Sequence, residues 1–94
     1  MFVGVMEVTL AVPANSLKEK RSVVKRILSK MRQTFHVAAA EVEEQDIVGT
    51  AVLGFTIVSS DHQFVERVLA KTLDAIDAMY LAEIIDDSKV IEKY

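Results

Sequence analysis

The sequence has no cysteine, no tryptophan, one proline, three isolated glycines and six aromatic side chains among its 94 residues. The lack of cysteine excludes disulfide bonds, thiolate zinc sites and a cysteine nucleophile. The isolated glycines offer no phosphate-binding loop of the G-x-G-x-x-G or G-K-[ST] type. No apolar run approaches the roughly eighteen residues that span a bilayer, and Glu7 interrupts the apolar N-terminal run too early for a signal peptide. We therefore expect a soluble, cytoplasmic protein without membrane contact.

The composition is that of a small globular protein, with 51% hydrophobic and 27% charged residues. A chain of this length can bury about two-thirds of its unfolded surface, which is enough for one modest core. We expect a single domain over residues 1–94. The formal net charge is -3, so any attraction to polyanions must come from a local asymmetry of charge rather than from the whole molecule.

Hydrophobic periodicity predicts six elements. Alternating apolar residues indicate strands at 2–12 and 50–59, with weaker strands at 37–43 and 84–93. A 3.6-residue apolar period indicates helices at 16–35 and 60–81, with Ser16 and Ser60 as their N-caps. The order β-α-β-β-α-β is typical of the α+β, ferredoxin-like split βαββαβ fold. We therefore expect a four-stranded antiparallel sheet with both helices on one face and the other face open.

The first predicted helix carries most of the positive charge. The stretch S-L-K-E-K-R-S-V-V-K-R-I-L-S-K-M-R (16–32) holds seven of the eleven basic residues and one acid, Glu19. At 100° per residue, four of the basic side chains fall in a band beside the apolar stripe and extend roughly 20 Å along the helix. We call these four residues the basic ridge: Lys18, Arg21, Lys25 and Arg32. Lys20 lies at the far edge of the apolar stripe.

This arrangement of charge is locally unfavourable. None of the seven basic residues has an acid three or four positions away, and like charges at that spacing cost about 0.2–0.5 kcal/mol per pair. The basic residues in the opening turns also oppose the helix dipole. An anion should compensate them, and three sources remain open: an acidic protein partner, an external polyanion such as RNA, or the chain's own acids in one subunit or across a dimer. The acids available for the last are Glu41, Glu43, Glu44 and Asp46.

Three segments give the chain a resemblance to a known family. S-L-K-E-K-R-S-V-V-K (16–25), A-E-V-E-E-Q-D (40–46) and L-G-F-T-I-V-S-S-D (53–61) resemble the YlxP-like family of small bacterial proteins of unknown function. The resemblance implies a ferredoxin-like fold in a cytoplasmic bacterial protein. The family's genes often lie beside those for translation initiation and ribosome maturation factors, which favours RNA or ribosome work. The chain departs from the family pattern at His36 and at 48–50, and the family supplies no catalytic residues.

Candidate catalytic and metal sites are weak. Ser59-Ser60-Asp61-His62 holds the residue types of a hydrolase triad, but four consecutive residues at a helix start do not converge as a triad does. His62 and Glu66 could share a metal on one helix face, but no third ligand has a supporting spacing. The sheet carries too few aromatic residues for base stacking in the manner of an RRM domain. We expect no catalytic residue, no metal and no cofactor.

The sequence therefore favours a non-enzymatic RNA- or ribosome-associated module that binds phosphates through its first helix. The predicted contacts are Lys18, Lys20, Arg21, Lys25 and Arg32. The alternative is a homo-oligomeric interaction module. In that case the open sheet face bearing Val3 and Val5 would form a homodimer, and the basic helix would pair with the protein's own acidic residues.

Overall fold

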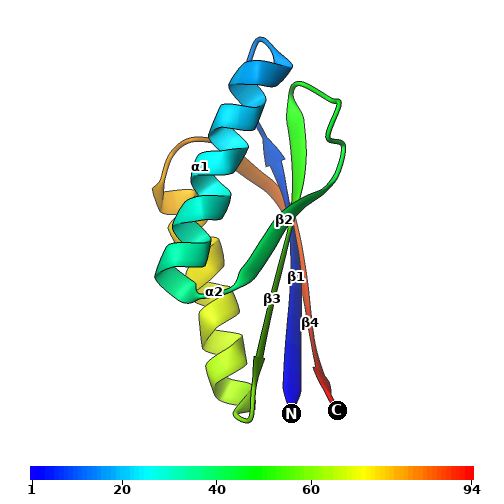
Figure 1. Cartoon of the computed structure of the whole chain (residues 1–94), viewed down its shortest axis with the longest axis vertical. Helices are drawn as coiled ribbons and strands as arrows, with labels where there is room; N and C mark the ends of the chain where they lie inside the picture. The colour runs from blue at the N-terminus through cyan, green and yellow to red at the C-terminus, as the bar shows by residue number, and fades with distance from the viewer.

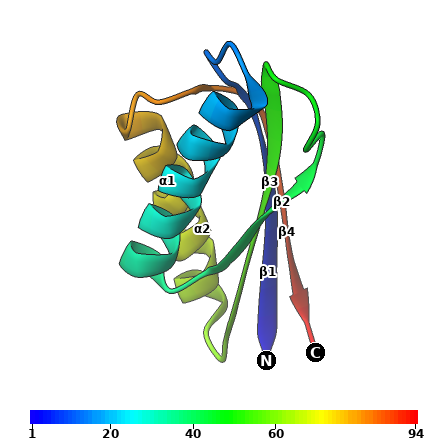
Figure 2. The same ribbon diagram turned by 45° about the horizontal axis from the view of Figure 1, so that its top comes forward.

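A computed structural model describes all residues, 1–94. The elements are β1 (Phe2–Ala11), α1 (Leu17–Phe35), β2 (Ala38–Glu43), β3 (Thr50–Ser59), α2 (His62–Ala78) and β4 (Glu83–Lys93). The four strands form one antiparallel sheet in the order β2-β3-β1-β4. Both helices cover the same face of the sheet, and the other face is open (Figures 1 and 2). The predicted ferredoxin-like fold is confirmed. Neither helix is long and apolar enough to cross a membrane.

Local capping sets the start of each helix. At α1 the Ser16 hydroxyl accepts from the Glu19 N–H at 3.1 Å, and the Glu19 carboxylate accepts from the Asn15 N–H at 2.7 Å. The N-cap of α2 is Asp61, whose carboxylate accepts from the Gln63 N–H at 2.9 Å. The prediction of Ser60 was wrong by one residue, because an aspartate in extended conformation caps at least as well as serine.

The C-terminal half differs from the prediction in two further details. Helix α2 ends at Ala78 rather than near 81, because Tyr80 adopts the left-handed conformation (φ 53°) and stops the helical path. Strand β4 starts at Glu83, one residue before the predicted start, and continues through the polar run 86–88. β4 is an edge strand and most of its side chains are exposed, so polar residues are tolerated there.

The core lies between the sheet and the helices. Strand β1 runs through the middle of the sheet, paired along its whole length with β3 and β4. Its buried side chains Met6, Val8 and Leu10 share one cluster with α1 and α2 residues that include Met31 and Ile76. Gly4 occupies a position with no room for a side chain, because a Cβ there would lie 2.4 Å from a Val65 methyl carbon. Close helix-to-sheet packing therefore requires glycine at this point.

Candidate functional site

The basic ridge lies on an exposed flank of α1. The side chains of Lys18, Arg21, Lys25 and Arg32 are all solvent-exposed. Arg32 donates a hydrogen bond to the main-chain oxygen of Ala39 in β2, so the C-terminal end of the ridge lies next to this edge strand. A peptide carbonyl carries only a partial charge, and this contact leaves the guanidinium positively charged.

Lys20 does not belong with the other predicted contacts. Its side chain is fully buried, and its Nζ donates to the carbonyl oxygens of Glu44 at 2.6 Å and Ile47 at 2.5 Å. The same Nζ lies 3.1 Å from Glu41 Oε2. That oxygen accepts no well-aligned hydrogen bond, so the contact is an ion pair rather than a directed bond. Lys20 fastens α1 to β2 and to the β2–β3 connection, and the prediction that it contacts an external anion was wrong.

The position of Lys20 on the helical wheel carried a signal of this role. Leu17 and Val24 lie three residues before and four residues after it, so Lys20 shares their inward-facing side of α1. A lysine within an apolar stripe is buried when its ammonium finds partners. Here two of the partners are carbonyls of the β2–β3 connection, whose position the hydrophobic periodicity of the sequence does not predict.

The ridge is not neutralised within the chain. The close contacts between basic and acidic side chains are Lys20–Glu41 and His62–Glu66, and no ridge residue takes part in either. Of the four acids that were available as internal counterions, only Glu41 meets a basic residue of α1. Glu43, Glu44 and Asp46 are exposed and form no ion pair. Four cations therefore remain on one helix flank without a carboxylate partner.

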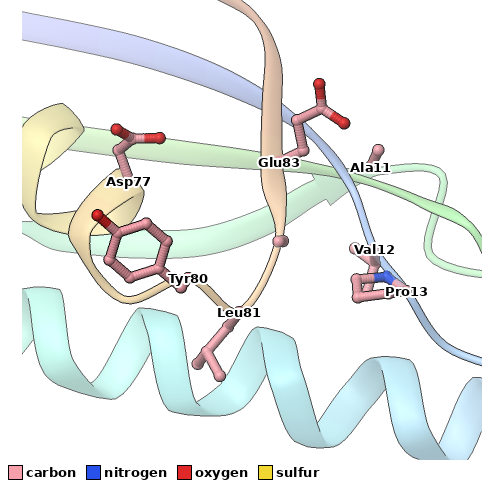
Figure 3. Close-up of a pocket in the computed structure, with 8 residues that line it drawn as sticks. Ala11, Val12, Pro13, Asp77, Tyr80, Leu81 and Glu83 are labelled. Atoms are coloured by element: carbon pink, nitrogen blue, oxygen red, sulfur yellow. The ribbon is translucent and has the colours of Figure 1, made fainter.

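The largest surface hollow, about 520 Å³, is lined by none of the ridge residues. Tyr80, Leu81 and Pro13 are among its lining residues, and the carboxylates of Asp77 and Glu83 stand at its rim (Figure 3). Two carboxylates make this hollow unfavourable for an anion. Its lining residues include no lysine or arginine.

The polar run before α2 has a structural use. The Ser59 hydroxyl accepts from the Asp61 N–H at 3.1 Å, and Asp61 caps the helix. His62 packs edge-to-face on Phe2 with ring centroids 5.4 Å apart, and its Nδ1 lies 3.9 Å from the Glu66 carboxylate. These residues do not converge as a triad, and the structure contains no group of three potential metal ligands.

The open face of the sheet exposes apolar side chains. Val5, Val42, Val58 and Val90 are each 44–59% exposed. Val42 lies over Gly54, where a Cβ would come within 2.9 Å of a Val42 methyl carbon. The open-face positions of β1, β2 and β3 hold no aromatic residue. At these positions Val3 pairs with Val58 and Val5 pairs with Thr56.

Comparison with known proteins identifies the family. The family model described as "Protein of unknown function (DUF503)" matches residues 3–88. A Bacillus subtilis (strain 168) protein described as "Uncharacterized protein YlxP" is 40% identical over 65 residues, which are 69% of this chain and 71% of that protein.

Solved structures share the fold at low identity. A de novo designed protein with a ferredoxin fold superposes with a TM-score of 0.62 at 12% identity, over 100% of this chain and 87% of that one. A putative antibiotic biosynthesis monooxygenase from Chloroflexus aurantiacus gives a TM-score of 0.58 at 12% identity, over 100% and 95% of the two chains. Such distant similarity shows the architecture alone. The family match and the YlxP relative go further and confirm the resemblance seen in the sequence: the chain belongs to the DUF503 family of proteins of unknown function.

Proposed function

We propose that the protein is a non-enzymatic, cytoplasmic module that associates with RNA or with a ribosomal subunit by binding phosphates along the basic ridge. The observation that carries the proposal is the set of four exposed cations without a carboxylate partner. Like charges on one helix flank lower stability unless an anion meets them, and nothing in the chain does so.

The form of the ridge favours a linear polyanion. Successive ridge residues are separated by about 4.5, 6 and 10.5 Å along the helix axis at 1.5 Å per residue. Two of the four are arginines, whose planar guanidinium groups match phosphate oxygens in a bidentate way. Contacts of this kind position a nucleic acid but read little sequence. The proposed binding is therefore salt-sensitive and weakly selective for sequence.

Charge reversal on the ridge tests the proposal. Lys25→Glu with Arg32→Glu should strongly weaken binding of a structured RNA at low salt, measured by fluorescence anisotropy. The matched control is Arg67→Glu with Lys71→Glu, which changes the net charge equally at two exposed residues of α2. The control should bind RNA far better than the ridge variant. Equal binding by wild type and the ridge variant would remove the ridge from the account, and equal losses in both variants would show that net charge alone governs binding.

A second candidate function is self-association through the open sheet face. The observation that favours it is the group of exposed valines on that face, because contiguous apolar patches commonly mark interfaces. Light scattering at micromolar concentration should then give twice the monomer mass of 10.5 kDa. Val5→Lys should return the protein to a monomer. A wild-type monomer would reject this candidate without affecting the ridge.

A further inference from the structure

A second hollow lies at the C-terminal end of α1, close to the end of the ridge. It measures about 480 Å³ and is lined by Phe35, His36, Ala38, Thr56, Ile57, Val58 and Phe64. These residues come from the end of α1, the start of β2, the end of β3 and the first turn of α2. Such a hollow is within the size range of small-ligand sites.

The hollow exists because β2 is shorter than β3. Strand β2 begins at Ala38 opposite Thr56, so residues 57–59 of β3 pair only with β1. In an antiparallel ladder, alternate residues direct both their N–H and C=O groups to the same side. At least one of these three residues therefore presents an unpaired donor and acceptor at the edge that β2 leaves uncovered.

Planar side chains surround this polar edge. Phe64 is 40% exposed, Phe35 is half-buried, and His36 is exposed in the left-handed conformation (φ 55°). Ala38, which also lines the hollow, is exposed and has a small side chain. Exposed aromatic rings next to unpaired main-chain groups suit a flat heteroaromatic ring, which stacks with its face and forms hydrogen bonds with its edge.

The last ridge residue, Arg32, lies near this hollow without lining it. Arg32 precedes Phe35 by three residues, a rise of about 4.5 Å. Its guanidinium is held on the carbonyl of Ala39, the residue next to Ala38 of the lining. A polyanion bound along the ridge would therefore extend toward an aromatic hollow that is lined by no acidic residue.

We propose that this hollow binds one unpaired base of a single-stranded RNA segment whose phosphates lie on the ridge. The inference rests on the proposed function and narrows its ligand from RNA in general to an unpaired segment. The positive charge of Arg32 beside the hollow selects a ring attached to a phosphate. A base inside a duplex is stacked and paired, and it cannot enter.

The test compares an RNA strand with a polyanion that has no bases. The probes are an eight-nucleotide strand of A and C, which cannot pair with itself, and inorganic polyphosphate of similar charge. Phe64→Ala should weaken binding of the strand by about 5- to 150-fold, the loss expected for one stacked base. The same change should leave polyphosphate binding unaltered. Lys25→Glu with Arg32→Glu should weaken both.

Wild-type protein provides an independent measurement if Phe64→Ala fails to fold. The ring-proton NMR signals of Phe35 and Phe64 should shift on addition of the strand and stay unchanged on addition of polyphosphate. Unmoved ring signals and equal affinity for the two probes would overturn the base site. If Lys25→Glu with Arg32→Glu still weakened binding in that case, the proposed function would stand without the base site. If the wild-type protein bound neither the RNA strand nor polyphosphate, both the base site and the proposed function would be overturned.

Discussion

Lys20 of α1 and Glu41 of β2 form an ion pair beneath the helix, with Nζ 3.1 Å from Oε2 and the lysine side chain fully buried. The pair divides the positive charge of α1 into two roles. Lys20 is buried and binds groups inside the molecule, and the four residues of the basic ridge face solvent. Residues of the same charge on one helix therefore differ in function by the side of the helix on which they lie.

Removing one member of this pair should destabilise the fold. Lys20→Met keeps the apolar stem but leaves the carboxylate of Glu41, whose side chain is 15% exposed, without its cation. We expect a loss of about 3 kcal/mol in the free energy of unfolding, measured with urea. Lys18→Met, at an exposed position, should change it by less than about 0.5 kcal/mol.

The double variant separates charge from packing. Lys20→Met with Glu41→Leu removes both charges, and it should recover part of the lost stability because no unpaired charge stays buried. Recovery should be incomplete, because the carbonyls of Glu44 and Ile47 still lack the lysine donor. Equal stability of Lys20→Met and wild type would mean that the ammonium contacts do not hold α1 to β2.

A methyl group at Gly4 should disturb the contact between β1 and α2. The added Cβ would meet Val65 at 2.4 Å and Leu69 at 2.9 Å. Gly4→Ala should therefore cost about 1–3 kcal/mol of stability by overpacking. Gly49→Ala is the control, because a Cβ there meets nothing within 4 Å and no glycine in the chain has a positive φ. It should be neutral or stabilise by about 0.4–1 kcal/mol. The reverse order of stabilities would refute this packing.

Tyr94 should titrate above the usual tyrosine range. Its hydroxyl donates to the Glu92 carboxylate at 2.7 Å, and this hydrogen bond, together with the negative charge, raises the phenol pKa above 10.0. Spectrophotometric titration in a Tyr80→Phe background should give a lower pKa after Glu92→Gln. Because the folded-state pKa is raised, the contact supports the fold below pH 10 and is lost as pH rises through the raised value. An unchanged pKa in the variant would contradict the contact.

The fold could be predicted because its strongest elements have a clear period. The alternation in 2–12 and 50–59 and the 3.6-residue stripe of α1 are local patterns, and their order leaves few topologies. Boundaries were less certain, since adjacent Ser60 and Asp61 are both good N-caps and the local sequence does not separate them.

The site was predictable only in part. The ridge follows from residue spacing on one helix, but the fate of Lys20 depends on carbonyls at residues 44 and 47, far from it in sequence. The hollow beside Phe64 depends on where β2 begins along β3. Its four segments come together only in the folded chain, and no local pattern marks them.

The salt dependence of RNA binding tests the central claim most directly. Each phosphate contact contributes about 0.7–0.9 to the slope of log Kobs against log salt concentration. Four ridge contacts should give a slope near -3 for the wild type. Lys25→Glu with Arg32→Glu should give a shallower slope, about -1.5 or closer to zero. A wild-type slope near zero, or the same slope in both proteins, would contradict phosphate binding by the ridge.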